Sequence, residues 1–214
     1  MLFKDRADAG IQLAALLKDY SSADNTVIIG LPRGGVITAA MVANELKLPL
    51  DVTCPRKIGA PGETELAIGA ITETGEGTFD DDLINRLNIS PEYIQEEVKK
   101  EKEVAKRRLT AYRKLRSKLD LSGRTVIIID DGLATGATMK AAIKSIQSEG
   151  ATKIVVAVPV APPEVLEEIQ KLVDEAFALD TPFLFQAIGE FYQDFTPTED
   201  EDVEAILQDF NQTK

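Results

Sequence analysis

The sequence predicts an α/β fold in which a mostly parallel, twisted sheet is flanked by helices. Short apolar runs rich in Val and Ile alternate with longer amphipathic segments along most of the chain. Such runs are typical of strands buried on both faces, and their alternation with helices is typical of parallel sheets. Because 214 residues suffice for one domain of this kind, we interpret residues 1–214 as a single domain.

The first half of the chain begins this alternation. We expect a helix at 8–20, a strand at 26–30, a helix at 36–46, a strand at 50–54, a loop at 55–62, a strand at 66–72 and a glycine-rich segment at 74–77. A helical insertion at 80–119 follows, in which Ser90 and Pro91 form a helix start.

The second half continues the pattern. Strands at 126–129, 154–158 and 175–179 alternate with helices at 137–149 and 162–172. The chain ends in an acidic tail at 194–214, which contains one helix near 199–210. These elements complete the predicted sheet and its helical cover.

The charged residues are unevenly distributed. The chain carries 24 basic and 36 acidic side chains, a net charge of −12, which argues against a nucleic-acid binder because such a protein needs a basic surface. Residues 96–118 nevertheless hold ten basic and four acidic side chains. This helix either exposes a solvated face with ion pairs between turns or brings cations near a phosphate site. The sequence leaves both interpretations open.

Cysteine usage and the N-terminal residues indicate a cytoplasmic protein. Cys54 is the only cysteine, so no internal disulfide forms, and without any histidine to activate it we interpret Cys54 as a small apolar residue in a strand. Charges occupy the N-terminal positions where a signal peptide has its apolar run. No window approaches the length of a membrane-spanning helix, so we expect no membrane partner.

The main candidate site follows the strand at 126–129. Asp130 and Asp131 lie at its carboxyl end, where open α/β sheets bind ligands. Carboxylates suit vicinal hydroxyls, a divalent cation, or both. A loop of small and hydroxylated residues then opens a helix, and its amides suit a phosphate dianion. This loop consists of Gly132, Leu133, Ala134, Thr135, Gly136, Ala137 and Thr138.

A phosphate loop beside a diol-binding acidic pair fits a phosphorylated pentose. Two other phosphate motifs are absent from the sequence. A Walker loop requires a Lys after its second Gly, and Gly136 is followed by Ala137. A dinucleotide fingerprint requires Gly-x-Gly-x-x-Gly, which residues 30–35 do not supply.

Two further segments carry cations beside glycine. Arg33, between a predicted strand and a helix, can clamp an anion, while Gly34 and Gly35 expose the backbone. Arg56 and Lys57 precede Gly and Pro residues, which suits a mobile loop that brings positive charge to a leaving group.

Four apolar residues, two acids and then Ala-Thr-Gly-Ala-Thr resemble the signature of the type I phosphoribosyltransferases. The resemblance spans most of the chain and points to a poorly characterised branch, whose members occur alone or fused to hydrolase domains. It implies the fold of that family, including a small hood.

The resemblance also implies roles for the candidate residues. Residues 134–138 would hold the 5′-phosphate of phosphoribosyl pyrophosphate, and Asp130 and Asp131 would contact the ribose hydroxyls and touch Mg²⁺, through water. Residues 33–35 would form the pyrophosphate loop. Arg56 and Lys57 would lie on the loop that closes over the reacting centre.

The resemblance does not identify the acceptor substrate. Phe183 or Phe185 would stack on a flat ring or pack in the core. We therefore expect transfer of phosphoribose to an unidentified, nitrogenous acceptor with release of pyrophosphate. The alternatives are a non-catalytic protein that binds phosphoribosyl pyrophosphate and regulates a partner, through the basic helix and acidic tail, and a hydrolase of such sugar phosphates. The resemblance and the aromatic C-terminal region favour a homodimer.

Overall fold

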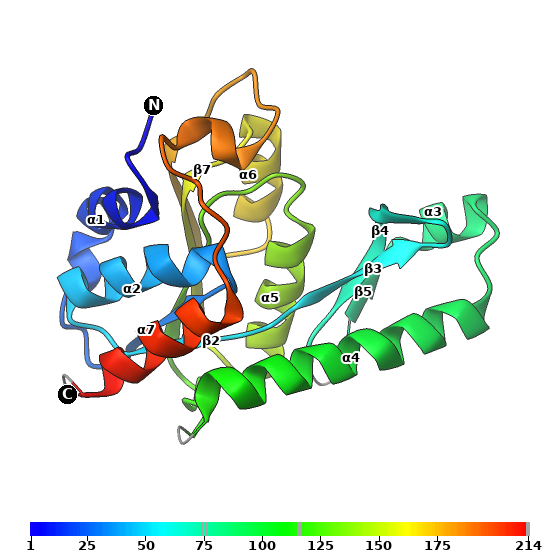
Figure 1. Ribbon diagram of the computed structural model, residues 1–214, viewed down its shortest axis with the longest axis horizontal. Coiled ribbons are helices and arrows are strands. Elements are labelled where there is room, and N and C mark those ends of the chain that lie inside the picture. Colours follow the sequence, from blue (N-terminus) through cyan, green and yellow to red (C-terminus); the bar gives the residue numbers. More distant parts are fainter. Residues whose placement is uncertain (74, 76, 115–116, 213–214) are drawn as a thin grey trace.

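The computed structural model describes residues 1–73, 75, 77–114 and 117–212, and it confirms the α/β fold (Figure 1). Five strands form a parallel sheet in the order β2-β1-β6-β7-β8. Their bounds are β1 Thr26–Gly30, β2 Leu50–Val52, β6 Thr125–Ile129, β7 Lys153–Val160 and β8 Glu175–Asp180.

Helices cover both faces of this sheet. Alternate residues of a strand point to opposite faces, and in β6 Ile127 and Ile129 enter one apolar cluster while Val126 and Ile128 enter another. The first cluster includes side chains of α1 Arg6–Leu16, α2 Gly34–Leu46 and α7 Asp200–Gln212. The second includes side chains of α5 Ala137–Ser148 and α6 Pro163–Gln170. A short 3-10 helix, Lys18–Tyr20, follows α1.

An arm projects from this body (Figure 1). It consists of an antiparallel sheet, β3 Arg56–Ala60, β4 Glu63–Ile71 and β5 Gly77–Phe79, with α3 Asp81–Arg86 and α4 Pro91–Arg113. Ser90 caps α4 by accepting a hydrogen bond from the amide of Tyr93 at 3.2 Å, as its sequence position predicts. The arm has a small apolar core of its own, formed around Ile58, Ala60, Ile68, Ile71 and Ile89.

The prediction of a loop at 55–62 is wrong, because most of these residues form strand β3. Pro61 and Gly62 form only the turn to β4, and Gly62 has the positive φ of +77° that glycine tolerates. The breakers that suggested a mobile loop therefore make a hairpin. The predicted insertion at 80–119 contains two helices, and positions 115 and 116 lie outside the described residues, as do 74 and 76 of the glycine-rich segment.

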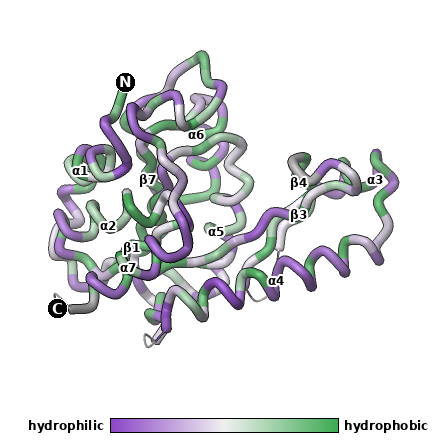
Figure 2. Tube along the Cα trace, viewed as in Figure 1, coloured by the Kyte–Doolittle hydropathy of each residue, from purple (hydrophilic) through white to green (hydrophobic). Residues whose placement is uncertain are grey.

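The basic helix α4 and the acidic tail bind each other. The hydroxyl of Tyr112 donates to Oδ1 of Asp200 at 2.5 Å, and Lys114 pairs with Glu204 at 2.5 Å. Val203 and Leu207 of α7 are fully buried in the main core. Figure 2 shows that α4 is largely hydrophilic, with a few hydrophobic positions. The tail is therefore part of the fold.

The segment near the C-terminus packs against the first residues of the chain and reaches Asp131 beyond β6. Phe3 forms a parallel bridge with Tyr192, next to the 3-10 helix Ile188–Phe191. The amide of Gln193 donates to the carbonyl oxygen of Phe3 at 2.8 Å. Among the described residues, the longest apolar helical stretch falls short of what a membrane span requires.

Candidate functional site

The acid pair lies directly beyond β6, at the carboxyl edge of the sheet, as predicted. Asp131 is buried and Asp130 is half-buried, and Oδ1 of Asp130 accepts a hydrogen bond from the amide of Asp131 at 2.9 Å. Burial raises the pKa of the Asp130 carboxyl, and the neighbouring Asp131 charge raises it further. The pair therefore favours a state in which a proton or a ligand compensates its charge.

Asp131 is held by residues from both ends of the chain. Nε of Arg6 donates to its Oδ2 at 2.7 Å, in an ion pair whose two side chains are almost fully buried. Burial raises the pKa of the Asp131 carboxyl, and Arg6 opposes that shift. The hydroxyl of Tyr192 donates to the backbone oxygen of Asp131 at 2.6 Å. Sequence reasoning missed Arg6, which lies 125 positions away and belongs to no motif.

The predicted pyrophosphate loop packs against the acid pair. A Cβ on Gly35 would lie 2.5 Å from Oδ1 of Asp130 and 2.8 Å from its Cα. A Cβ on Gly34 would collide with Oδ2 of Asp131 and lie 2.6 Å from Nε of Arg6. Both positions therefore require glycine because carboxylates approach their backbone closely.

Arg33 lies at the start of α2, after a cis peptide bond with Pro32. Its Nη1 pairs with Oε2 of Glu199 at 2.6 Å, so a carboxylate of the C-terminal segment contacts the cation that was predicted to clamp an anion. Sequence reasoning gave Glu199 no role at this site.

The loop between β6 and α5 has an inner and an outer part. Gly132 and Leu133 are buried, and the Leu133 amide donates to the carbonyl oxygen of Val160 at 2.9 Å. Gly136 adopts φ +72° at the start of α5, so the chain turns there into the helix. The outer part comprises Ala134 and Thr135, which are exposed, and Ala137 and Thr138, which are half-buried. The first amides of α5 have no acceptor within the helix, and the amide of Ala137 donates to Oγ1 of Thr135 at 3.5 Å.

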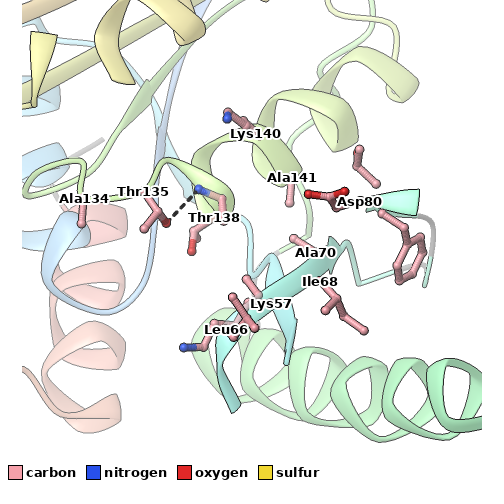
Figure 3. Close-up of a pocket in the computed structure, with 15 residues that line it drawn as sticks. Lys57, Leu66, Ile68, Ala70, Asp80, Ala134, Thr135, Thr138, Lys140 and Ala141 are labelled. Carbon is pink, nitrogen blue, oxygen red and sulfur yellow. Dashed lines mark hydrogen bonds between the residues drawn. The ribbon is translucent and has the colours of Figure 1, made fainter. Parts of the chain in front are cut away.

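A cavity of about 650 Å³ lies between this outer loop and the arm. Figure 3 shows Thr135 and Thr138 on one side, with Lys57 and Leu66 across from them. Its other lining residues are Ala67, Ile68, Gly69, Ala70, Thr78, Phe79, Asp80, Ala134, Ala137, Lys140 and Ala141. The structure thus places Lys57 in the wall of a cavity that the predicted phosphate loop also lines.

The other predicted site residues lie apart from this cavity. Asp130 and Asp131 are not among its lining residues, and Arg56 is turned toward Glu101, with which it pairs at 2.6 Å. Phe183 is 95% exposed, and the ring of Phe185 stacks on that of Phe191 with centroids 5.5 Å apart.

Cys54 behaves as an apolar residue. It is buried just beyond β2, rather than within the strand, and burial raises the pKa of its thiol to about 12. The thiolate is therefore scarce at neutral pH.

The described part of the chain contains no group of three or more side chains that would hold a metal by themselves. Asp130 and Asp131 offer carboxylate oxygens, although Oδ2 of Asp131 is already bound to Arg6. Mg²⁺ commonly uses one or two carboxylates together with waters and substrate phosphates. The acid pair fits a Mg²⁺ ion that arrives with a phosphorylated ligand.

Comparisons with known proteins agree with this geometry. Residues 3–193 match the family described as the phosphoribosyl transferase domain. Candidate phosphoribosyl transferases of two Mycobacterium tuberculosis strains, CDC 1551 and H37Rv, are each 42% identical over 206 residues. Each match covers 96% of this chain, but the chain spans only 46% of the relatives' length.

A solved structure shows the same architecture across the whole chain. The protein TT1426 from Thermus thermophilus is 42% identical, with a TM-score of 0.84 over 98% of this chain and 99% of that one. The sequence signature, the parallel sheet and these matches agree. The chain belongs to the phosphoribosyl transferase family.

Proposed function

We propose that the chain binds phosphoribosyl pyrophosphate with Mg²⁺ and transfers its ribosyl phosphate to a nitrogenous acceptor, releasing pyrophosphate. The observation that carries this proposal is the arrangement around the end of β6. A carboxylate pair, a glycine pair and an amide-rich helix start meet there, each suited to a different part of that substrate.

The amides at the start of α5 would hold the 5′-phosphate. They have no acceptor within the helix and belong to the same segment as the hydroxyls of Thr135 and Thr138, and the helix dipole favours an anion at this end. Gly136 lets the chain turn without a side chain in the way. This part of the site would fix the substrate without contacting the bond that breaks.

The acid pair would orient the ribose. Carboxylate oxygens accept hydrogen bonds from hydroxyls, and two neighbouring carboxylates match the two hydroxyls of a vicinal diol. Asp130 and Asp131 would also help to hold Mg²⁺, through water, and the ion would supply positive charge to the phosphate oxygens. The raised pKa of Asp130 fits a site whose charge a ligand compensates.

Cations beside the acid pair would stabilise the leaving group. Breaking the bond between ribose C1 and pyrophosphate leaves negative charge on the pyrophosphate, which Arg33 and the amides of Gly34 and Gly35 are suited to receive. Lys57 would contribute from the arm, because it lines the same cavity as Thr135 and Thr138. Arg56 would have to leave Glu101 to take part.

An acceptor base would stack on a phenylalanine of the segment that follows β8. Phe183 is exposed and would have to turn inward to stack on a base, whereas Phe185 already stacks on Phe191. We propose a cytoplasmic protein of nucleotide metabolism that forms a homodimer, and the exposed Phe183 and Leu184 would suit a contact between subunits.

Calorimetric titration tests the binding step. We expect the full chain to bind phosphoribosyl pyrophosphate in the presence of Mg²⁺, and a variant carrying both Asp130→Asn and Asp131→Asn to bind at least about 100-fold more weakly. Thermal unfolding of the variant serves as the folding control. Equal affinity of the folded variant and the wild type would refute the assignment of the acid pair.

Pyrophosphate release then separates the reaction classes. Release that requires an added purine or pyrimidine base supports the transferase. Tight binding without release across a panel of bases supports the regulatory alternative, in which the site binds without turnover. Release without any acceptor supports a hydrolase.

A further inference from the structure

Arg6 forms contacts that its position in the first turn of α1 does not explain. Its side chain is buried, and Nη1 donates to the backbone oxygen of Thr196 at 2.9 Å while Nε donates to Asp131. The ring of Phe195 lies against the guanidinium group, whose central carbon is 3.8 Å from the ring centroid. Arg6 therefore has fixed partners on three sides.

The same contacts fix Asp131. One carboxylate oxygen is bound to Arg6, and the backbone oxygen accepts the hydroxyl of Tyr192 at 2.6 Å. Gly34 packs against the ion pair so closely that no Cβ would fit there. A carboxylate held at one oxygen and packed from the side presents its other oxygen in a single direction.

A gain in folding stability does not by itself explain the buried ion pair between Arg6 and Asp131. Removing two charges from water costs free energy that a buried ion pair often fails to recover, and apolar residues of similar size frequently do as well. A planar guanidinium group does hold its donors in a fixed geometry, so the bond from Nη1 to Thr196 fixes the direction in which Nε donates to Asp131. This property serves a carboxylate whose orientation matters to a ligand.

We propose that Arg6 is a positioning residue of the sugar site, which holds Asp131 in the orientation that accepts a hydroxyl of ribose and so selects ribose over deoxyribose. The inference rests on the proposed function, because it takes the acid pair as the part of the site that binds the diol. Arg6 itself touches Asp131 and the C-terminal segment, and it acts on the ligand through Asp131.

Selectivity among sugar phosphates tests this role. The probes are ribose 5-phosphate, its 2-deoxy and 3-deoxy analogues and inorganic phosphate, each titrated calorimetrically against the full chain. We expect the wild type to bind ribose 5-phosphate at least about 10-fold more tightly than either deoxy analogue, the size of a hydrogen bond to a charged group. Inorganic phosphate reports on the phosphate loop alone.

Two substitutions of Arg6 separate the effect of its side-chain geometry from the effect of its charge. Arg6→Gln removes the charge, and Arg6→Lys keeps it but lacks the planar fork. We expect both to reduce the preference over at least one analogue to within about 3-fold, while inorganic phosphate binds within about 3-fold of the wild-type affinity. Full preference in Arg6→Lys would show that the charge suffices, and would overturn the positioning role.

Two further variants guard against a general loss of structure. Phe195→Leu removes the ring beside the Arg6 guanidinium group and leaves the charges of Arg6 and Asp131 unchanged. If the Arg6 variants do not fold, this variant replaces them in the test. Unchanged preference of Phe195→Leu for ribose 5-phosphate over the deoxy analogues would then refute the inference. Arg113→Gln breaks another largely buried ion pair, with Asp51 at 3.2 Å, and should lower the melting temperature without changing the preference. An equal loss of preference in Arg113→Gln would show that instability alone is the cause.

The wild-type result separates this inference from the proposed function. If the wild type binds ribose 5-phosphate without any preference over the analogues, the acid pair does not bind the diol and the proposed function fails. If the wild type shows the preference and the Arg6 variants retain it, only the role of Arg6 fails.

Discussion

The two halves of the candidate site differ in how firmly the rest of the chain holds them. The half that contains Asp130 and Asp131 is enclosed by Arg6, Tyr192 and the glycines at the start of α2. The half that contains the start of α5 opens onto a cavity of about 650 Å³, with the arm on its far side. The half with the acid pair is packed like a protein core, whereas the half with the start of α5 borders an open cavity.

This difference suggests a division of labour. A packed half suits groups whose orientation must be exact before a ligand arrives, because packing and hydrogen bonds from neighbouring segments hold such groups in place. An open half suits a phosphate group, which backbone amides can bind from one side. Substitutions in the packed half should therefore affect both folding and binding, whereas those in the open half should affect binding alone.

The largest effect is expected at Gly35. Replacement by Ala places a Cβ 2.5 Å from Oδ1 of Asp130 and 2.8 Å from its Cα, so the acid pair must shift. We expect Gly35→Ala to lose about 1–3 kcal/mol of unfolding free energy and to bind Mg²⁺ and phosphoribosyl pyrophosphate about 100-fold more weakly. Thermal unfolding and calorimetry measure these two changes.

Gly62→Ala is the matched control for that substitution. Gly62 has a positive φ, but a Cβ there would meet nothing within 4 Å, and it lies in the turn of the arm. We expect this variant to lose stability through backbone strain and to keep its affinity within about 3-fold. Full affinity in Gly35→Ala would show that the packed half tolerates displacement, and would remove the basis of the comparison.

An intermediate effect is expected at the open half. Lys57 lines the cavity, while its neighbour Arg56 is paired with Glu101 at 2.6 Å. We expect Lys57→Ala to weaken binding of phosphoribosyl pyrophosphate about 10-fold and Arg56→Ala to weaken it less than about 3-fold, measured by calorimetry. Both variants should keep the wild-type melting temperature within a few degrees. A larger loss in Arg56→Ala would mean that the arm rearranges and that Arg56 is the cation that binds the ligand.

The smallest effect is expected at the exposed ion pair between Arg33 and Glu199. Removal of the Glu199 charge should leave Arg33 free to bind pyrophosphate. Because both side chains are substantially exposed, the gain in pyrophosphate affinity for Glu199→Gln should be only about 2- to 5-fold. Glu201→Gln, which removes the same charge nearby, controls for the general field of the tail. An equal gain in both variants would attribute the effect to net charge and not to the contact.

The body of the molecule was predictable because its signals are local. Strands β1, β6 and β7 are continuous apolar runs, and the segment after β6 combines acids, small residues and a helix start within nine positions. Each of these features depends on neighbours in sequence, so one sequence suffices to find it.

The arm and the enclosure of Asp131 were not predictable in the same way. Residues 56–60 look like a loop because of the Pro and Gly that follow, and only pairing with β4 makes them a strand. The contact of Arg6 with Asp131 joins residues 125 positions apart, and the pairing of α4 with α7 depends on how two polar helices pack. No local pattern records such contacts.

A crystal structure of the full chain with Mg²⁺ and phosphoribosyl pyrophosphate tests the central claim most directly. We predict that the 5′-phosphate contacts the amides of residues 135–138 and that the ribose hydroxyls contact Asp130 and Asp131. A ligand bound elsewhere in the cavity, with the acid pair still touching only protein, would contradict this account.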